Sequence, residues 1–202
     1  YGKLFGQWIQ GAAVLQHNSS ARFDPAQALE ILSRFGVTSF CAPPTVYRMM
    51  VLLDLTKYDL QDLRHCTGAG EPLNPEVMKE WEEGTGLTIY DGYGQTETVL
   101  LVANYRCLPV KPGSMGKPTP GAEIAIVDEE GDILPPGEEG QIAVKVNPNR
   151  PVGLFREYWK APDAMASSFQ GDWYLTGDKA SMDEDGYFWF IGRADDVIIS
   201  AG

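Results

Sequence analysis

The apolar residues of this chain change their period near residue 111, and this change constrains the fold most. Before it, segments with helix signals alternate with short apolar runs, whereas after it apolar and polar residues alternate with period two. Alternating helices and strands are typical of a covered parallel sheet, and period-two runs between turn residues are typical of antiparallel sheets. We therefore predict an α/β fold: a mainly parallel sheet with covering helices, followed by a small distorted β-barrel-like subdomain.

Two helices have clear start signals in the first half. Asp24 can cap a helix that begins at Pro25, and Gly36 can end it, because these residue types favour those positions. A second helix is expected from Asn74-Pro75 to about Gly84. The apolar stripe of the first helix comprises Ala28, Leu29, Leu32 and Phe35.

Several short runs have strand signals. Each is rich in apolar and β-branched residues and is followed by turn residues. A turn at residues 183–186 is expected to fold residues 187–191 back as a further hairpin strand. The other predicted strands are residues 37–42, 87–90, 123–127 and 141–146.

Composition excludes some classes of function. The chain has 202 residues, 44% of them hydrophobic, enough to bury a sizeable core. Its net charge of −12 comes without a cluster of Lys and Arg, which argues against nucleic-acid binding. There is no run of about 20 apolar residues to span a membrane. Cys41, Cys66 and Cys107 lack ligand-like spacing and are expected to be reduced thiols, while His17 and His65 are expected to be structural.

The most informative motif is Asp-Gly-Tyr-Gly-Gln-Thr-Glu at residues 91–97. It follows a predicted buried strand, and open α/β sheets bind ligands where strands end. Gly92 and Gly94 permit close backbone approach to a ligand. Thr96 and Glu97 place a hydroxyl beside a carboxylate, as needed to hold a phosphate and its metal. The alternative is a tight turn with a solvated Thr-Glu pair.

Further motifs stand in order around this one, at residues 68–72, 174–178 and 192–196. Together they resemble the adenylate-forming superfamily of acyl-CoA synthetases, luciferases and peptide-synthetase adenylation domains. The resemblance covers nearly the whole chain and is closest to medium-chain acyl-CoA synthetases, through residues 42–49 and 185–188. It implies activation of a medium-chain fatty or aryl acid by ATP, followed by transfer to CoA. Two alternatives stay open: an acyl-AMP ligase or adenylation domain that loads a carrier-protein thiol, and a non-catalytic β-rich binding module.

The resemblance also implies roles for individual residues. Adenylation brings two anions together, so the site needs a metal and donors for phosphate. Glu97 is the expected Mg²⁺ ligand and Thr96 the expected α-phosphate donor, and we treat these two as catalytic. Tyr93 would stack on adenine, Asp178 would accept from the ribose hydroxyls, and Arg193 would lie beside it. Further ATP or AMP contacts are expected from Gly70, Glu71, Pro72, Asp91, Gly92, Gly94 and Gln95.

Gly94 bears on the choice of acid. In acetate-specific relatives a tryptophan closes the acyl pocket at this position, so glycine leaves room for a longer or aromatic acid. We expect Gly94→Trp to shift preference towards acetate or propionate. Other pocket candidates, each of which could equally be ordinary core, are Trp8, Val46, Tyr47 and Val99.

The resemblance also suggests a domain organisation. Residues 1–111 would form part of an α/β subdomain, 112–192 a β-rich subdomain, and 193–202 a hinge at Asp195 leading to a C-terminal domain. We expect the chain to be a segment of a longer enzyme, without the upstream phosphate loop and the C-terminal catalytic lysine, and therefore inactive by itself. The expected compartment is the cytoplasm, or the mitochondrial matrix in a eukaryote.

Overall fold

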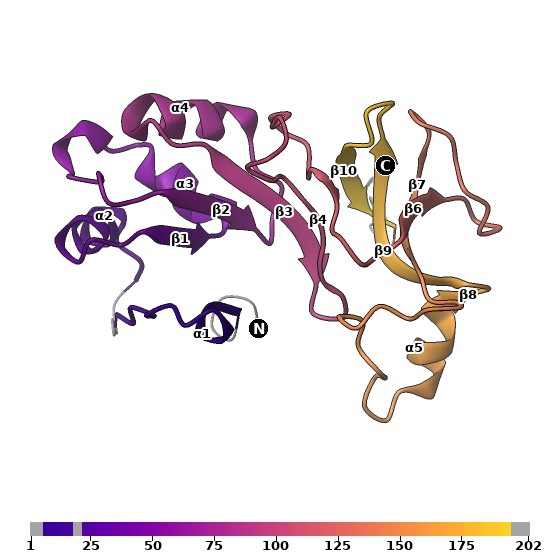
Figure 1. Ribbon diagram of the computed structural model, residues 1–202. Helices are drawn as coiled ribbons and strands as arrows, with labels where there is room; N and C mark the ends of the chain where they lie inside the picture. Colours follow the sequence, from indigo (N-terminus) through magenta and orange to yellow (C-terminus); the bar gives the residue numbers. More distant parts are fainter. Residues whose placement is uncertain (1–5, 18–21, 195–202) are drawn as a thin grey trace, which may run out of the picture. The chain divides into compact units, whose positions relative to one another are not determined.

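The computed structural model describes residues 6–17 and 22–194 (Figure 1). The chain forms two compact units, Tyr1–Gly92 and Tyr93–Gly202, and each is described by itself. The predicted hinge at Asp195 lies outside the described residues. The predicted divisions at residues 111 and 192 stay predictions.

The first unit contains a parallel sheet with helices in the connections. Strand β2 pairs with β1 on one side and β3 on the other, both in parallel, with Cys66 opposite Phe40 and Ile89. The mainly parallel sheet is therefore confirmed for these three strands. The strands are β1 (Ser39–Ala42), β2 (His65–Ala69) and β3 (Ile89–Gln95), of which residues 93–95 belong to the second unit. The helices are α1 (Gln7–Ile9), α2 (Pro25–Arg34), α3 (Pro44–Met50), the 3₁₀ helix η2 (Leu55–Lys57) and α4 (Pro75–Thr85).

Local capping explains where α2 and α4 begin. The Asp24 carboxylate accepts hydrogen bonds from the amides of Ala26 and Gln27, and Asn74 accepts one from the amide of Glu76 at 2.8 Å. Such caps satisfy amides that have no partner within a helix. Both predicted starts are confirmed.

The predicted apolar stripe of α2 is only partly buried. Leu29 and Leu32 belong to the core, but Phe35 is 58% exposed. The prediction for Phe35 is wrong because this residue caps the helix after its last turn, where the guanidinium of Arg34 lies over its ring.

Strand β3 is longer than predicted. The sequence predicted a strand ending at Tyr90 and a loop over 91–97, but β3 continues to Gln95, and the turn is confined to residues 96–98. The next strand, β4 (Val99–Ala103), begins directly after that turn. Gly94 lies so close to it that a Cβ atom would overlap with the Val99 carbonyl oxygen and lie 2.9 Å from the Leu100 Cα atom. The motif therefore continues the strand.

We expect Gly94→Ala to lower the free energy of unfolding by about 3 kcal/mol, because the new methyl group meets backbone that has no room to yield. Gly192→Ala is the matched control, since a Cβ atom there meets no atom within 4 Å. Chemical denaturation of both variants measures the difference. Equal stabilities would contradict the close approach of β4.

The second unit is built on an antiparallel sheet of order β10-β9-β7-β6, with β8 paired to β9. Its ends, β10 and β6, leave the sheet open. The predicted strands at 123–127 and 141–146 and the hairpin at 183–191 are confirmed. The remaining elements are β5 (Lys117–Pro118), β6 (Ile124–Val127), β7 (Glu139–Lys145), α5 (Pro162–Ser167), β8 (Phe169–Gln170), β9 (Trp173–Met182) and β10 (Phe188–Arg193).

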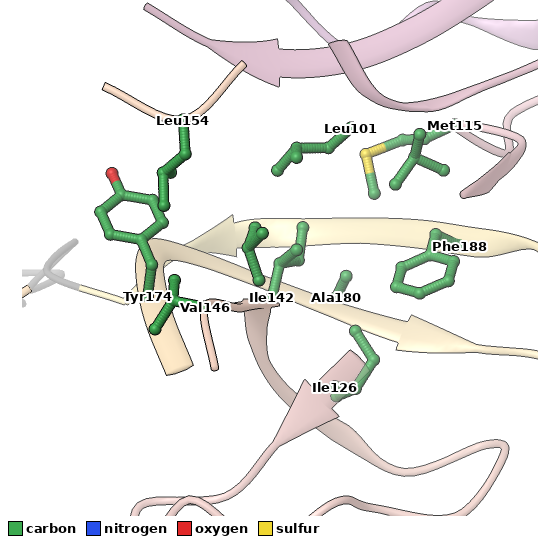
Figure 2. Packing of buried hydrophobic residues seen from close by; sticks show 11 residues of the cluster. Leu101, Met115, Ile126, Ile142, Val146, Leu154, Tyr174, Ala180 and Phe188 are labelled. Atoms are coloured by element: carbon green, nitrogen blue, oxygen red, sulfur yellow. The ribbon is translucent and has the colours of Figure 1, made fainter. Parts of the chain in front are cut away.

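A large apolar cluster lies in the second unit. Figure 2 shows its side chains gathering from the strands of this sheet, from β4, which carries Leu101, and from the loops that carry Met115 and Leu154. Burying such side chains is the main favourable term in folding. Tyr174 and Ala180 of β9 belong to this cluster, which therefore packs against the strand that carries Thr176 and Asp178. Its members include Leu101, Met115, Ile126, Ile142, Val146, Leu154, Tyr174, Ala180 and Phe188.

The turn between β9 and β10 is tied by Asp183. This carboxylate accepts hydrogen bonds from Lys111 Nζ at 2.7 Å, from the Tyr187 amide at 2.9 Å and from Trp189 Nε1 at 3.2 Å. Partial burial would raise the pKa of Asp183, but these donors outweigh it and lower the pKa from 3.8 to about 2. Asp183 therefore stabilises the fold as a charged group.

We expect Asp183→Asn to lower the free energy of unfolding at pH 7 by about 2 kcal/mol, because it removes charge-assisted hydrogen bonds. The folded pKa lies below the ordinary value, so this stability is present above about pH 4 and is lost as pH falls through about 2. Urea titrations at a series of pH values should therefore show the difference in free energy of unfolding between the variant and the unmodified chain becoming smaller as pH falls towards 2. Glu184→Gln, an exposed change in the same turn, is the control. A gap that stays constant down to pH 2 would refute the role of the charge.

Candidate functional site

The turn that follows β3 presents Thr96 and Glu97. The Gln95 amide donates to Thr98 Oγ1 at 2.9 Å, and the Thr98 amide donates to the Gln95 carbonyl oxygen at 3.2 Å. These bonds close the turn with the side chain of Thr96 exposed and that of Glu97 half-buried. The predicted hydroxyl and carboxylate thus stand together on a short, braced loop.

A buried carboxylate lies in the same unit. The side chain of Asp178, on β9, is only 7% exposed. Its Oδ2 atom accepts hydrogen bonds from the Tyr93 hydroxyl and from Gln95 Nε2, both at 2.6 Å. Arg193 Nη1 lies 3.5 Å from Oδ1. A buried charge is costly unless it is paired. Here Oδ2 of Asp178 accepts two hydrogen bonds and Oδ1 faces the guanidinium of Arg193.

Further hydrogen bonds connect Gln95 and Asp178 to other residues of β9. Gln95 Nε2 also donates to the Thr176 carbonyl oxygen at 2.8 Å, and the Thr176 hydroxyl donates to the Ile142 carbonyl oxygen at 2.9 Å. The Asp178 amide donates to Thr176 Oγ1 at 3.2 Å. The Tyr174 hydroxyl donates to Gln95 Oε1 at 3.4 Å. The side-chain amide of Gln95 therefore donates through Nε2 and accepts through Oε1, and these bonds fix its orientation.

Burial keeps the tyrosines of this cluster neutral. Burial, reinforced by the hydrogen bond to Asp178, raises the pKa of Tyr93 well above its ordinary value. Burial, reinforced by the neighbouring Tyr158 hydroxyl, does the same for the pKa of Tyr174. Both hydroxyls therefore keep their protons and act as donors.

A cavity of about 540 Å³ lies next to this cluster, whose Gln95, Tyr174 and Thr176 form part of the cavity wall. This volume is in the range of small-molecule sites. Its wall carries hydroxyl, amide, carboxylate and guanidinium groups, a set that suits a polar ligand with phosphate and hydroxyl groups. The polar residues that line it include Gln95, Thr96, Glu97, Tyr158, Thr176 and Arg193.

The role of Glu97 as a Mg²⁺ ligand stays a prediction. Its carboxylate oxygen is a ligand type that Mg²⁺ favours. Among the described residues, no group of three or more His, Cys, Asp or Glu side chains could hold a metal ion. A cation at Glu97 would therefore take most of its oxygen ligands from phosphates and water, as Mg²⁺ does in nucleotide sites.

The remaining predicted nucleotide residues lie in the first unit. The Glu71 carboxylate accepts hydrogen bonds from Thr45 at 2.7 Å and from Arg48 at 3.0 Å, so its side chain serves α3. Gly70 has a positive φ of 106°, and burial raises the pKa of Asp91 to about 7. The contribution of this unit to the site stays a prediction, including that of Pro72 and Gly92.

The predicted acyl-pocket residues have varied surroundings. Tyr47 is fully buried, donates to the Thr67 carbonyl oxygen at 3.1 Å and packs edge-on against Trp81. It therefore has a core role in the first unit. Trp8 is 56% exposed on α1. An acyl-pocket role for these residues stays a prediction, as it does for Val46, Gly94 and Val99.

Three residues of this site had no predicted role, although two of them belong to the motif at residues 174–178. Tyr174 and Thr176 stand two positions apart on β9, with Asp178 two further on. Alternate residues of a strand share a face, so the spacing alone could have grouped them. Tyr158 lies 61 residues from Glu97, to which its hydroxyl donates, and no local pattern indicates it.

Curated proteins of similar sequence include the mitochondrial acyl-coenzyme A synthetase ACSM3 of Rattus norvegicus, 54% identical over the whole chain, and that of Homo sapiens, 52% identical. The chain spans only 35% and 34% of the lengths of these relatives.

The chain is also similar to solved structures. An anthranilate CoA ligase in complex with anthranoyl-AMP matches 96% of this chain with a TM-score of 0.87 and 36% identity, over 36% of its own length. The ATP-bound MatB of Rhodopseudomonas palustris matches 88% of the chain with a TM-score of 0.79 and 32% identity, over 34% of its own length. Residues 2–159 match the family of AMP-binding enzymes. The chain belongs to this family, as its motifs predicted.

Proposed function

We propose that this chain is part of an ATP-dependent, AMP-forming acyl-CoA synthetase. The observation that carries the proposal is a polar cavity lined by Thr96, Glu97 and Arg193, together with the buried carboxylate of Asp178. Asp178 contacts two residues of the cavity wall, Gln95 and Arg193. That arrangement supplies acceptors for a ribose, donors for a phosphate and a carboxylate for a cation. The family membership and the names of the relatives support the same activity.

The reaction proceeds in two steps. A carboxylate oxygen of the acid attacks the α-phosphorus of ATP, the bond to the β-phosphate oxygen breaks, and pyrophosphate leaves. The thiolate sulfur of CoA then attacks the acyl carbonyl carbon and expels AMP. Asp178 accepts from the ribose hydroxyls, Tyr93 offers its ring to the adenine, and Thr96 donates to the α-phosphate. Mg²⁺ bound at Glu97 would neutralise phosphate charge.

The acid is proposed to be a medium-chain fatty acid or an aryl acid. The similarity to an anthranilate CoA ligase supports an aromatic acid as the substrate, and the similarity to acyl-coenzyme A synthetases supports a fatty acid. The Gly94→Trp substitution is not a clean test of the acyl pocket, because a side chain at this position would also collide with the backbone of β4. Among the described residues, no helix is long and apolar enough to cross a membrane. The mitochondrial relatives support the mitochondrion as the compartment.

The full-length protein, supplied with octanoate, ATP and CoA, tests this proposal. The expected products are octanoyl-CoA, AMP and pyrophosphate in equal amounts, measured by liquid chromatography. Octanoyl-AMP that accumulates whether or not CoA is present would favour the alternative, a ligase or adenylation domain that serves a carrier-protein thiol. No ATP consumption with octanoate, benzoate or other acids of similar size would contradict the synthetase activity itself.

A further inference from the structure

The loop segment of residues 155–158 forms hydrogen bonds with both the backbone and the side chain of Glu97. The Phe155 amide donates to the Glu97 carbonyl oxygen at 2.6 Å. The Tyr158 hydroxyl donates to Glu97 Oε1 at 3.1 Å. Both contacts lie within the second unit. The turn that carries Glu97 is thus tied to the segment that precedes α5.

That segment is itself firmly anchored. Arg150 Nη2 donates to the Phe155 carbonyl oxygen at 2.6 Å. The Phe155 ring contacts the rings of Tyr158 and Tyr174, with centroids 4.5 and 5.5 Å apart. Leu154 is buried in the apolar cluster, where Figure 2 shows it beside Tyr174. The position of the Tyr158 hydroxyl is therefore set by the core of the unit.

We propose that Tyr158 is a positioning residue for the metal–nucleotide complex and acts through Glu97. Its hydroxyl holds Oε1, so the carboxylate keeps one orientation and offers Oε2 to the cation. Among the described residues, no second donor reaches this carboxylate. Removing a group that orients a metal ligand in this way commonly lowers metal affinity by about 10- to 100-fold. The inference rests on the proposed role of Glu97 and adds a residue outside the recognised motifs.

Tyr158→Phe in the full-length protein tests the proposal, because it removes the hydroxyl and keeps the ring that packs against Phe155. Mn²⁺ replaces Mg²⁺ as the probe, and its binding is followed by electron paramagnetic resonance in the presence of a non-hydrolysable ATP analogue. We expect the Mn²⁺ dissociation constant to rise about tenfold. AMP affinity measured in EDTA and the melting temperature should stay unchanged, which a general structural defect would not allow.

Tyr105→Phe is the matched control. It makes the same chemical change at another half-buried tyrosine of the second unit, whose hydroxyl forms no hydrogen bond with any described residue. Mn²⁺ affinity should be unaffected in this variant.

Two results would overturn the proposal. One is unchanged Mn²⁺ affinity in Tyr158→Phe, and the other is an equal loss of AMP affinity in EDTA. Glu97→Gln separates this failure from failure of the proposed function. If Glu97→Gln weakens Mn²⁺ binding but Tyr158→Phe does not, only the positioning role is wrong. If neither variant weakens it, the metal-binding role of Glu97 is wrong as well.

Discussion

Asp178→Ala in the full-length protein should weaken AMP binding about 100-fold. Two ribose hydroxyls lose a charged acceptor, and hydrogen bonds to charged groups are each worth about 1.5 kcal/mol or more. The effect should depend on those hydroxyls. The unmodified protein should therefore prefer AMP to 2′,3′-dideoxy-AMP by about the same factor, and the variant should bind both nucleotides equally. Calorimetric titration with the two nucleotides measures this ratio.

Tyr93→Phe is the control for indirect effects, because Asp178 also accepts a hydrogen bond from the Tyr93 hydroxyl. This variant removes that bond and keeps the aromatic face. We expect its AMP affinity to fall by about fivefold at most, with the preference for the ribose hydroxyls retained. If Asp178→Ala still distinguished AMP from the dideoxy analogue, Asp178 would not be the ribose acceptor.

Glu97→Gln should lower the rate of adenylate formation about 100-fold or more, because the carboxylate charge that binds the cation at the phosphates is lost. The amide keeps the size of the side chain and an oxygen that can still accept from Tyr158. ATP–pyrophosphate exchange measures the first half-reaction directly.

Glu157→Gln provides the comparison for this experiment. It neutralises an exposed acid that neighbours Tyr158 in sequence and should leave the exchange rate unchanged. Exchange at the original rate in Glu97→Gln would show that the cation binds elsewhere. Restoration of the Glu97→Gln rate simply by raising Mg²⁺ would instead support a defect in metal affinity.

Features set by local interactions could be predicted from the sequence. Asp24 and Asn74 cap helices through bonds to amides two or three residues away, and both starts were predicted correctly. Pro44 shows the limit of such signals. The strand predicted for residues 37–42 does end at Ala42, but proline also favours the first turn of a helix, and α3, which was not predicted, begins at Pro44.

Features set by long-range contacts could not be predicted in this way. The link between Tyr158 and Glu97 exists only in the folded chain. The length of β3 was missed for another reason: Gly92 and Gly94 were interpreted as loop signals, whereas β3 continues to Gln95 and Gly94 meets Val99 of the next strand. Motif order indicated Tyr93, Glu97 and Asp178, but not that Gln95 would bridge Asp178 and the backbone of β9.

We infer that the turn after β3 and the part of β9 around Asp178 bind one adenylate. Hydrogen–deuterium exchange of the full-length protein, measured with and without a non-hydrolysable octanoyl-adenylate analogue, tests this inference. We expect backbone amides of residues 93–98 and 174–178 to exchange more slowly when the analogue is bound. Binding of the analogue with unchanged exchange in these two segments would contradict it.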